Sequence, residues 1–300
     1  CIRDRSKTGR IMEKNIIVPI DFSDISKDVA FYADQWAQRT KGKLHFLYVS
    51  QMPEMSYYPA HFEQADKFDE TEQIARLDAF LTPLDLKADR EICHEYGTPY
   101  YKILDLVERE KVDLVIMAAH SHTMLGRLFM GSNTDYVVHH IHCPLYVFKK
   151  PEKKTAKIIL VPLDFSKANH MLVETGMEWA ERENAELHFV HVMQPVDYSY
   201  YGAESSWGVG KAELVLTEEH GQKAINEFLS GHKINVPYKS VVLFSNSSYL
   251  RLLEYQQDTN AMLIMIAGHD HSVAGRIFLG SNTDYLLHHV NIPIYVHKEP

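Results

Sequence analysis

The sequence predicts an α/β protein that consists of two tandem doubly wound domains, each built on a parallel sheet. Its 300 residues, 45% hydrophobic and 24% charged, suffice for two hydrophobic cores. The second half of the chain repeats the first, most plainly where residues 265–289 match residues 116–140. In each half, short apolar runs alternate with segments of helical periodicity, which is typical of a sheet covered by helices on both faces.

The elements of the first copy follow from hydrophobic periodicity along the chain. Continuously apolar or nearly apolar runs predict strands at residues 15–20, 44–49, 113–119 and 144–149. Helical spacing predicts helices at residues 24–40, 100–112 and 132–141, and an acidic, helix-like stretch follows the second strand. Strands without polar alternation are buried on both faces, which indicates a parallel rather than an antiparallel sheet.

The internal repeat also predicts the domain boundaries. Its register pairs Asp21 with Asp164, Ser23 with Ser166, Trp36 with Trp179, and His45 with His188. The segment 149–155 is charged and contains a proline, so we interpret it as the linker. We therefore expect domains at residues 12–150 and 151–300, with residues 1–11, before the methionine at position 12, as an extension outside the fold.

Composition excludes several classes of function. A formal net charge of −9 without clustered basic residues argues against binding to nucleic acid, and no apolar run reaches the roughly 18 to 20 residues that span a bilayer. Cys1, Cys93 and Cys143 lack C-x-x-C spacing, which argues against a disulfide framework or a thiolate zinc site and favours the reducing cytoplasm. The sequence has no Walker A, G-x-S-x-G or H-E-x-x-H motif, so no motif predicts a hydrolase.

A ligand of a doubly wound sheet binds beyond the carboxyl ends of the strands, where the strand order reverses. If the first and fourth strands flank that point, Asp21 and the loop ending at Gly131 and Ser132 converge in the first copy. Glycine and serine before an apolar helix can present backbone N–H groups and the positive end of the helix dipole to an anion such as phosphate. Arg127 and its counterpart Arg276 can add positive charge.

Both features also have a purely structural interpretation. Ser132 with Asp135, and Ser281 with Asp284, have the spacing of a capping box, which starts a helix without any ligand. Asp21 could likewise be a simple cap for the first helix. The residue types alone leave these alternatives open.

The residues at these points resemble the universal stress protein family in its tandem two-domain form. The matching stretches are IIVPIDFS and ILVPLDFS at the start of each copy, Gly-Ser before a helix, and then HCPLYV and NIPIYV. The resemblance implies an adenine nucleotide alpha hydrolase-like fold with five strands in the order 3-2-1-4-5, and dimer-like packing between the two copies, with a homodimer as a further option. It also implies a stress-response regulatory protein that binds adenine nucleotide and at most hydrolyses ATP slowly.

The resemblance further implies which residues contact ATP, with or without Mg²⁺. ATP-binding members carry an aspartate near the adenine and a G-x2-G-x9-G-[ST] loop around the ribose and phosphates. By position, the candidate contacts of the first copy are Asp21, Ser23, Val49, Ala118, His120, Ser121, Arg127, Gly131, Ser132 and Asn133. Those of the second copy are Asp164, Ser166, Gly280, Ser281 and Asn282.

The two copies differ in how well they keep this loop. Its first two glycines are replaced by Ala118 and Ser121 in the first copy, and by Ala267 and Asp270 in the second. Glycine permits close approach of the backbone to phosphate, so both copies depart from the pattern. Asp270 would also repel phosphate, because like charges about 4 Å apart cost about 1 kcal/mol even in water. We therefore expect the first domain to be the better nucleotide site.

The paired histidines suggest a second kind of ligand. His269, Asp270 and His271 could bind a zinc ion in the extended loop, although no further protein ligand is evident there; His120 and His122 are the counterparts in the first copy. His139 and His140 follow the start of their helix by about 12 Å, too far to join such a loop site, so we expect the pair to satisfy terminal carbonyls. His45 and the aligned His188 are expected in the core.

Three functions are therefore consistent with the sequence. The first is a regulatory module that binds an adenine nucleotide in at least one domain. The second is a nucleotide-free interaction or scaffold protein, favoured by the missing glycines and by Asp270. The third is a zinc-binding module that uses the H-x-H loops. Repeated tyrosines at positions 57–58 and 200–201 are interpreted as packing residues.

Overall fold

The computed structural model describes residues 15–50, 70–119, 130–194, 217–268 and 281–298. In the first half the elements are β1 (Asn15–Pro19), α1 (Asp24–Thr40), β2 (Lys43–Ser50), α2 (Glu70–Leu81), η2 (Thr82–Leu84), β3 (Arg90–Tyr96), α3 (Pro99–Glu110), β4 (Leu114–Ala118), α4 (Ser132–His140) and β5 (Leu145–Phe148). In the second half they are β6 (Ala156–Pro162), α5 (Lys167–Glu183), β7 (Glu186–Met193), α6 (Glu218–Leu229), β8 (Tyr238–Phe244), α7 (Ser248–Thr259), β9 (Ala261–Ala267), α8 (Ser281–His289) and β10 (Ile294–His297).

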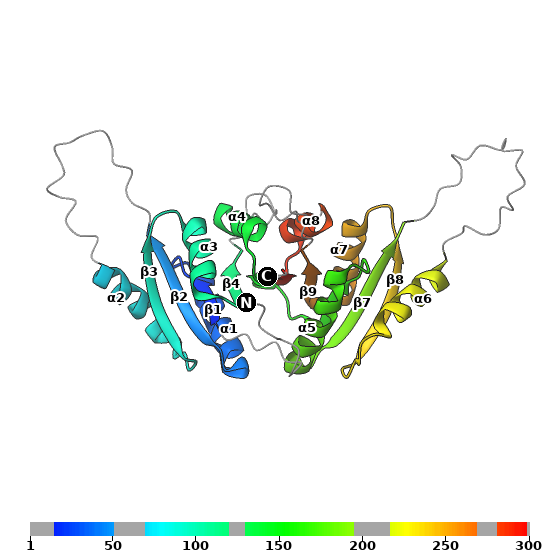
Figure 1. Ribbon diagram of the computed structural model, residues 1–300, viewed down its shortest axis with the longest axis horizontal. Coiled ribbons are helices and arrows are strands. Elements are labelled where there is room, and N and C mark those ends of the chain that lie inside the picture. Colours follow the sequence, from blue (N-terminus) through cyan, green and yellow to red (C-terminus); the bar gives the residue numbers. More distant parts are fainter. Residues whose placement is uncertain (1–14, 51–69, 120–129, 195–216, 269–280, 299–300) are drawn as a thin grey trace, which may run out of the picture.

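The strands form one sheet that runs through both halves of the molecule (Figure 1). Its order is β3-β2-β1-β4-β5-β10-β9-β6-β7-β8, so the first half has the predicted order 3-2-1-4-5, and the second half repeats it. Within each half the strands pair in parallel, whereas β5 and β10 pair antiparallel, with Tyr146 opposite Tyr295. The last strands of the two domains pair with each other and join the two five-stranded sheets into one ten-stranded sheet.

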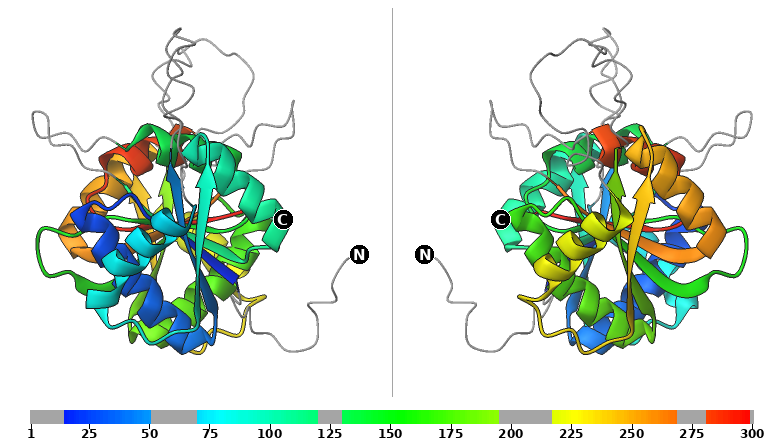
Figure 2. Two further views of the ribbon diagram at one scale, coloured as in Figure 1. Left: turned by 90° about the vertical axis from the view of Figure 1, so that its left-hand side faces the viewer. Right: turned by 90° about the vertical axis from the view of Figure 1, so that its right-hand side faces the viewer.

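Helices cover both faces of this sheet (Figure 2). On β1, Ile16 and Val18 belong to the core beneath α1 and α2, while Ile17 belongs to the core beneath α3 and α4. All three side chains are fully buried. This is why the strand is apolar from Ile16 to Pro19, as expected for a parallel sheet between two helical layers. No helix in the described ranges combines the length and the apolar character needed to cross a bilayer.

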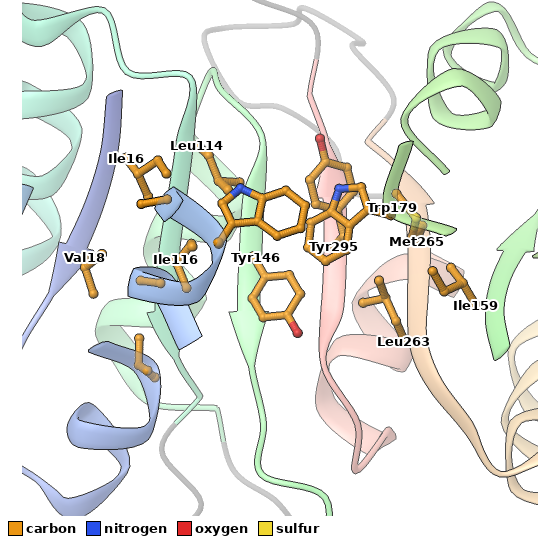
Figure 3. Close-up of a cluster of buried hydrophobic side chains, with 14 of the residues drawn as sticks. Ile16, Val18, Leu114, Ile116, Tyr146, Ile159, Trp179, Leu263, Met265 and Tyr295 are labelled. Atoms are coloured by element: carbon orange, nitrogen blue, oxygen red, sulfur yellow. The ribbon is translucent and has the colours of Figure 1, made fainter. Parts of the chain in front are cut away.

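The core beneath α1 and α5 continues from one domain into the other (Figure 3). Trp36 and Trp179 occupy equivalent positions on these helices, and their ring centroids lie 4.0 Å apart, with both side chains 1% exposed. Tyr146 and Tyr295 from the two central strands belong to the same cluster. Large buried aromatic rings contribute strongly to such an interface, so the tandem domains form an intramolecular pair.

Lys149, the first residue of the predicted linker at residues 149–155, packs against the second domain. Its side chain is buried, and its ammonium group donates to the carbonyl oxygens of Leu287 at 2.5 Å and Val290 at 2.7 Å. These carbonyls lie at the end of α8, where a helix leaves its last acceptors unpaired and favours a nearby cation. The first residue of the predicted linker is therefore a contact of one domain with the other.

Candidate functional site

A cleft of about 520 Å³ opens beyond the carboxyl ends of β1 and β4. These neighbouring strands are paired in the sheet, and the chain order reverses between them, so the cleft lies where a doubly wound sheet binds its ligands. Its volume falls within the range of about 300 to 1,000 Å³ that is usual for small-molecule pockets. Six of the predicted contacts line it: Asp21, Val49, Ala118, Gly131, Ser132 and Asn133.

The start of α4 forms one wall of this cleft. The helix begins at Ser132, its N-cap is Gly131, and no side chain makes a capping hydrogen bond, so the predicted capping box of Ser132 and Asp135 does not form. The hydroxyl of Thr134 instead donates to the carbonyl of Ala118 at 2.8 Å, which fixes the start of the helix to the end of β4. The unpaired N–H groups and positive dipole end of α4 therefore lie at the cleft and suit an anion.

Asp21 lines the cleft and also shapes the turn that leads into α1. Its carboxylate oxygen Oδ1 accepts hydrogen bonds from the backbone N–H of Ser23 at 3.1 Å, from the Ser23 hydroxyl at 2.5 Å and from the Ser26 hydroxyl at 2.6 Å. The N-cap of α1 is Ser23, not Asp21 as the structural interpretation supposed. Phe22, between them, has a φ of 64°, a left-handed conformation that few residues of its size adopt.

The opposite wall contains three residues that the sequence did not single out. Phe22 and Tyr48 pack edge to face with ring centroids 4.6 Å apart, and the guanidinium of Arg76, on α2, lies 4.3 Å from the centroid of Phe22. All three line the cleft. Arg76 belongs to no motif, so the signal in the sequence was its mismatch with Ala224 at the same point of the equal-length helix α6.

The equivalent cleft of the second domain measures only about 190 Å³. Two polar side chains on its lining bond backbone groups of the turn between β6 and α5. Asn169 Oδ1 accepts from the N–H groups of Asp164 and Phe165 at 2.8 and 3.0 Å. His191 Nδ1 bonds the carbonyl of Leu163 at 2.8 Å. The positions aligned with these two side chains in the first domain are Ser26 and Tyr48. The second cleft is therefore both smaller and differently lined.

The structure places the remaining predicted residues as follows. Ser23 and Ser166 are the N-caps of α1 and α5, and the backbone N–H of Ser166 donates to Asp164 Oδ1 at 2.9 Å. Helix α8 begins at Ser281, but the structure does not describe the side chains of Ser281 and Asn282. Also outside the described residues are His120, Ser121, Arg127, Gly280 and the proposed metal ligands His269, Asp270 and His271, together with His122, Arg276 and the tyrosines at 57–58 and 200–201.

The histidines that the structure describes include two of the predicted helix-end roles. His140 Nδ1 bonds the carbonyl of Tyr136 at 2.7 Å, and His289 Nδ1 bonds the carbonyl of Tyr285 at 2.8 Å. His45 and His188 are buried, as expected for core positions. Burial lowers the pKa of both imidazoles below the ordinary value of 6.5, because the charged form loses its hydration.

Two doubly wound α/β domains in one chain, each with a cleft where its strand order reverses, define a tandem α/β class of protein. The sequence model of the Universal stress protein family matches residues 12–149 and 155–298. The chain therefore belongs to the universal stress protein family.

Known relatives agree with this assignment. A crystal structure of a universal stress protein from Archaeoglobus fulgidus shares the fold over 97% of this chain and 98% of its own, with a TM-score of 0.67 and 17% identity. Universal stress protein Rv2005c of Mycobacterium tuberculosis is 23% identical over 244 residues, covering 77% of this chain and 78% of its own length. Universal stress protein MJ0531 of Methanocaldococcus jannaschii is 27% identical over 153 residues, covering 49% of this chain and 89% of its own.

Proposed function

We propose that this protein is a stress-response regulator that binds an adenine nucleotide, with ATP as the first candidate, in the cleft of its first domain (residues 12–150). One observation carries the proposal. The start of α4, with its unpaired N–H groups, and the end of β1, with Asp21, line the same cleft of about 520 Å³. A site of this size with an anion-binding helix terminus suits a phosphorylated ligand.

The lining suggests how the two ends of a nucleotide lie. The phosphates would meet the N–H groups of Ser132 and Asn133 at the positive end of α4. The base would lie toward Val49, Asp21 and the guanidinium of Arg76, because planar rings stack on guanidinium planes and apolar walls. Magnesium would enter with the phosphates rather than through a cage of protein ligands.

The second domain has a different role in this proposal. Its cleft of about 190 Å³ is below the usual size for a nucleotide-sized ligand, and Asn169 and His191 fill positions where the first domain has Ser26 and Tyr48. We infer that this domain binds no nucleotide and acts as the fixed partner of the first. A change in the first domain would then be transmitted through the shared sheet and through the pair of tryptophans.

The test is direct binding of ATP to the purified full chain. Isothermal titration with ATP and Mg²⁺ should give one nucleotide per chain, and protein denatured straight after purification should release adenine absorbance. Hydrolysis, followed as phosphate release, should be slow or absent. No heat at high micromolar protein, together with no released adenine in repeated preparations, would favour the nucleotide-free interaction function instead.

The thiols Cys93 and Cys143 are free, in keeping with the proposed cytoplasmic location.

A further inference from the structure

Helices α4 and α8 lie side by side where the two domains meet (Figure 1). Each carries an aspartate followed four residues later by a histidine: Asp135 and His139 on α4, Asp284 and His288 on α8. Residues four apart lie on the same face of a helix. The internal repeat therefore brings two identical Asp-x3-His faces together, one from each domain.

The four side chains contact one another across the domain boundary. His139 Nε2 lies 3.4 Å from Asp284 Oδ1 and 3.7 Å from Asp135 Oδ1. His288 Nε2 repeats this arrangement, 3.4 Å from Asp135 Oδ1 and 3.7 Å from Asp284 Oδ1. Each imidazole is thus closer to the carboxylate of the other domain than to the carboxylate of its own helix.

We propose that Asp135, His139, Asp284 and His288 form a binding site for one divalent transition-metal ion, such as zinc, that links the two domains. Neutral imidazole and carboxylate are ordinary zinc ligands, and a structural zinc ion takes four ligands in a tetrahedron. With metal–ligand bonds of about 2.0 to 2.1 Å, the ligand atoms of such a tetrahedron are about 3.3 to 3.4 Å apart. The four distances between a histidine Nε2 and an aspartate Oδ1, 3.4 and 3.7 Å, are close to this spacing and longer than those of a usual N–H···O hydrogen bond, about 2.7 to 3.2 Å. Asp135, Asp284 and His288 already form a compact set of three ligands, and His139 would move in as the fourth.

Charge favours a cation at this point. Ligand atoms of Asp135, Asp284 and His288 all lie within 4.8 Å of one another, so two carboxylates of like charge face each other at short range. Their repulsion is relieved when a divalent ion lies between them. The side chains are 32% to 46% exposed, which gives an ion direct access from solvent.

The neighbouring histidines hold the two helices without competing for the ion. His140 and His289 bond helix carbonyls through Nδ1 and stack on Tyr136 and Tyr285, with ring centroids 3.9 and 3.7 Å apart. In each His-His pair, the first histidine thus faces the other domain and the second secures its own helix.

The alternative is a cluster of ion pairs with no metal, in which protonated imidazoles neutralise the aspartates. Zinc binding to the full chain separates the two. Equilibrium dialysis against zinc chloride, with elemental analysis, should give one zinc ion per chain. Substitution of Co²⁺ should give the intense visible absorption of a tetrahedral complex.

The double variant His139→Ala/His288→Ala should lose this zinc ion and the cobalt spectrum. We expect its affinity to fall more than about 100-fold, because even the loss of outer-shell partners of a metal ligand costs about 10 to 100-fold. The matched control His140→Gln/His289→Gln removes the same number of histidines from the same helices and should keep both signals. If the double alanine variant does not fold, Asp135→Asn/Asp284→Asn provides the same test while preserving side-chain shape.

A stability measurement adds a second readout. Zinc should raise the melting temperature of the unmodified chain and of the glutamine control, but not that of the alanine variant. The proposal is overturned if the chain binds no zinc at micromolar concentration, or if zinc stays bound after both His139 and His288 are replaced. It is also overturned if the ion is lost only when the loop residues His269 and His271 are changed to alanine.

Discussion

The two domains present equivalent clefts at the same point of one sheet, yet the first measures about 520 Å³ and the second about 190 Å³. Their strands and helices follow in the same order. The linings differ in side chains that bond nearby backbone groups: the second domain has Asn169 and His191, whereas the first domain has Ser26 and Tyr48 at these points.

This difference shows that the repeated fold supplies a position for a ligand but not the ligand site itself. One domain can keep an open cleft while the other serves as its structural partner, because both rest on a common sheet and a common core. Function in such a tandem chain must therefore be assigned cleft by cleft. The predictions below test whether the two clefts differ in this way.

The largest expected effect comes from filling the first cleft. Val49 lines it, and Val192 lines the second cleft at the aligned position. Val49→Trp should lower the affinity for ATP at least about 100-fold, or about 2.7 kcal/mol, because the indole occupies the space of the ligand. Val192→Trp should leave that affinity unchanged. Isothermal titration of both variants decides, and the reverse pattern would move the nucleotide site to the second domain.

The turns before α1 and before α5 should contribute different amounts to the free energy of unfolding. Asn169→Ala leaves the backbone N–H groups of Asp164 and Phe165 without their amide acceptor, and Asn169 is 2% exposed. We expect the free energy of unfolding to fall by about 1 to 3 kcal/mol in urea denaturation. Ser26→Ala should cost less, about 1 kcal/mol. It removes the hydroxyl that donates to Asp21 Oδ1 at 2.6 Å, but this carboxylate is exposed and keeps Ser23 as a donor, and the hydroxyl accepts one backbone N–H at a longer 3.4 Å. Equal losses would mean that the two turns are held alike.

Arg76 tests the base-binding side of the first cleft. Its guanidinium lies over Phe22, and the aligned residue of the second domain is Ala224. Arg76→Ala should weaken ATP binding about 10-fold, or about 1.4 kcal/mol, through loss of a planar cation at the wall. Ala224→Arg should create no second site, because the second cleft remains too small. Isothermal titration measures the affinity of Arg76→Ala and the number of nucleotides bound by Ala224→Arg. An unchanged affinity in Arg76→Ala would remove this residue from the site.

Much of the fold was predictable because the buried central strands are apolar at nearly every position. The central strands β1 and β4 and their order in the sheet follow from that pattern and from the family resemblance. Strand β3, with the sequence REICHEY, was not recognised from its residues. It lies at the edge of the sheet and is mostly half-buried, so its charged side chains hide the strand signal.

The site was predictable in part for a related reason. Topology alone places Asp21 and Ser132 at one cleft, since the switch point of a doubly wound sheet is fixed by strand order. Arg76 was missed because it reaches the cleft from a helix that no motif connects to it. The cluster of His139 and His288 was missed because each histidine is isolated within its own copy, and only the packing of α4 on α8 brings the pair together.

The smallest expected effect is on the pH dependence of stability, and it again contrasts matched residues. Burial lowers the pKa of His45 and of His188 below 6.5. For His45, the nearby ammonium of Lys43 lowers the pKa further, whereas for His188 the carboxylate of Glu186, 3.3 Å away, opposes the effect of burial. The largest cause after burial therefore reinforces burial in the first domain and opposes it in the second. Weaker causes reduce this contrast, because Glu91, 3.7 Å from His45, raises the pKa of His45 and Lys239 lowers that of His188.

A histidine whose pKa is lower in the folded state binds fewer protons there than in the unfolded chain. Its stabilising contribution is present above the unfolded value of 6.5 and is lost as the pH falls from there toward the folded value. Melting temperatures measured between about pH 5 and about pH 8 should therefore fall on the acid side. His45→Gln should remove more of this dependence than His188→Gln, because the largest cause after burial lowers the pKa of His45 and raises that of His188. An equal or opposite ranking would show that Lys43 and Glu186 do not distinguish the two buried imidazoles.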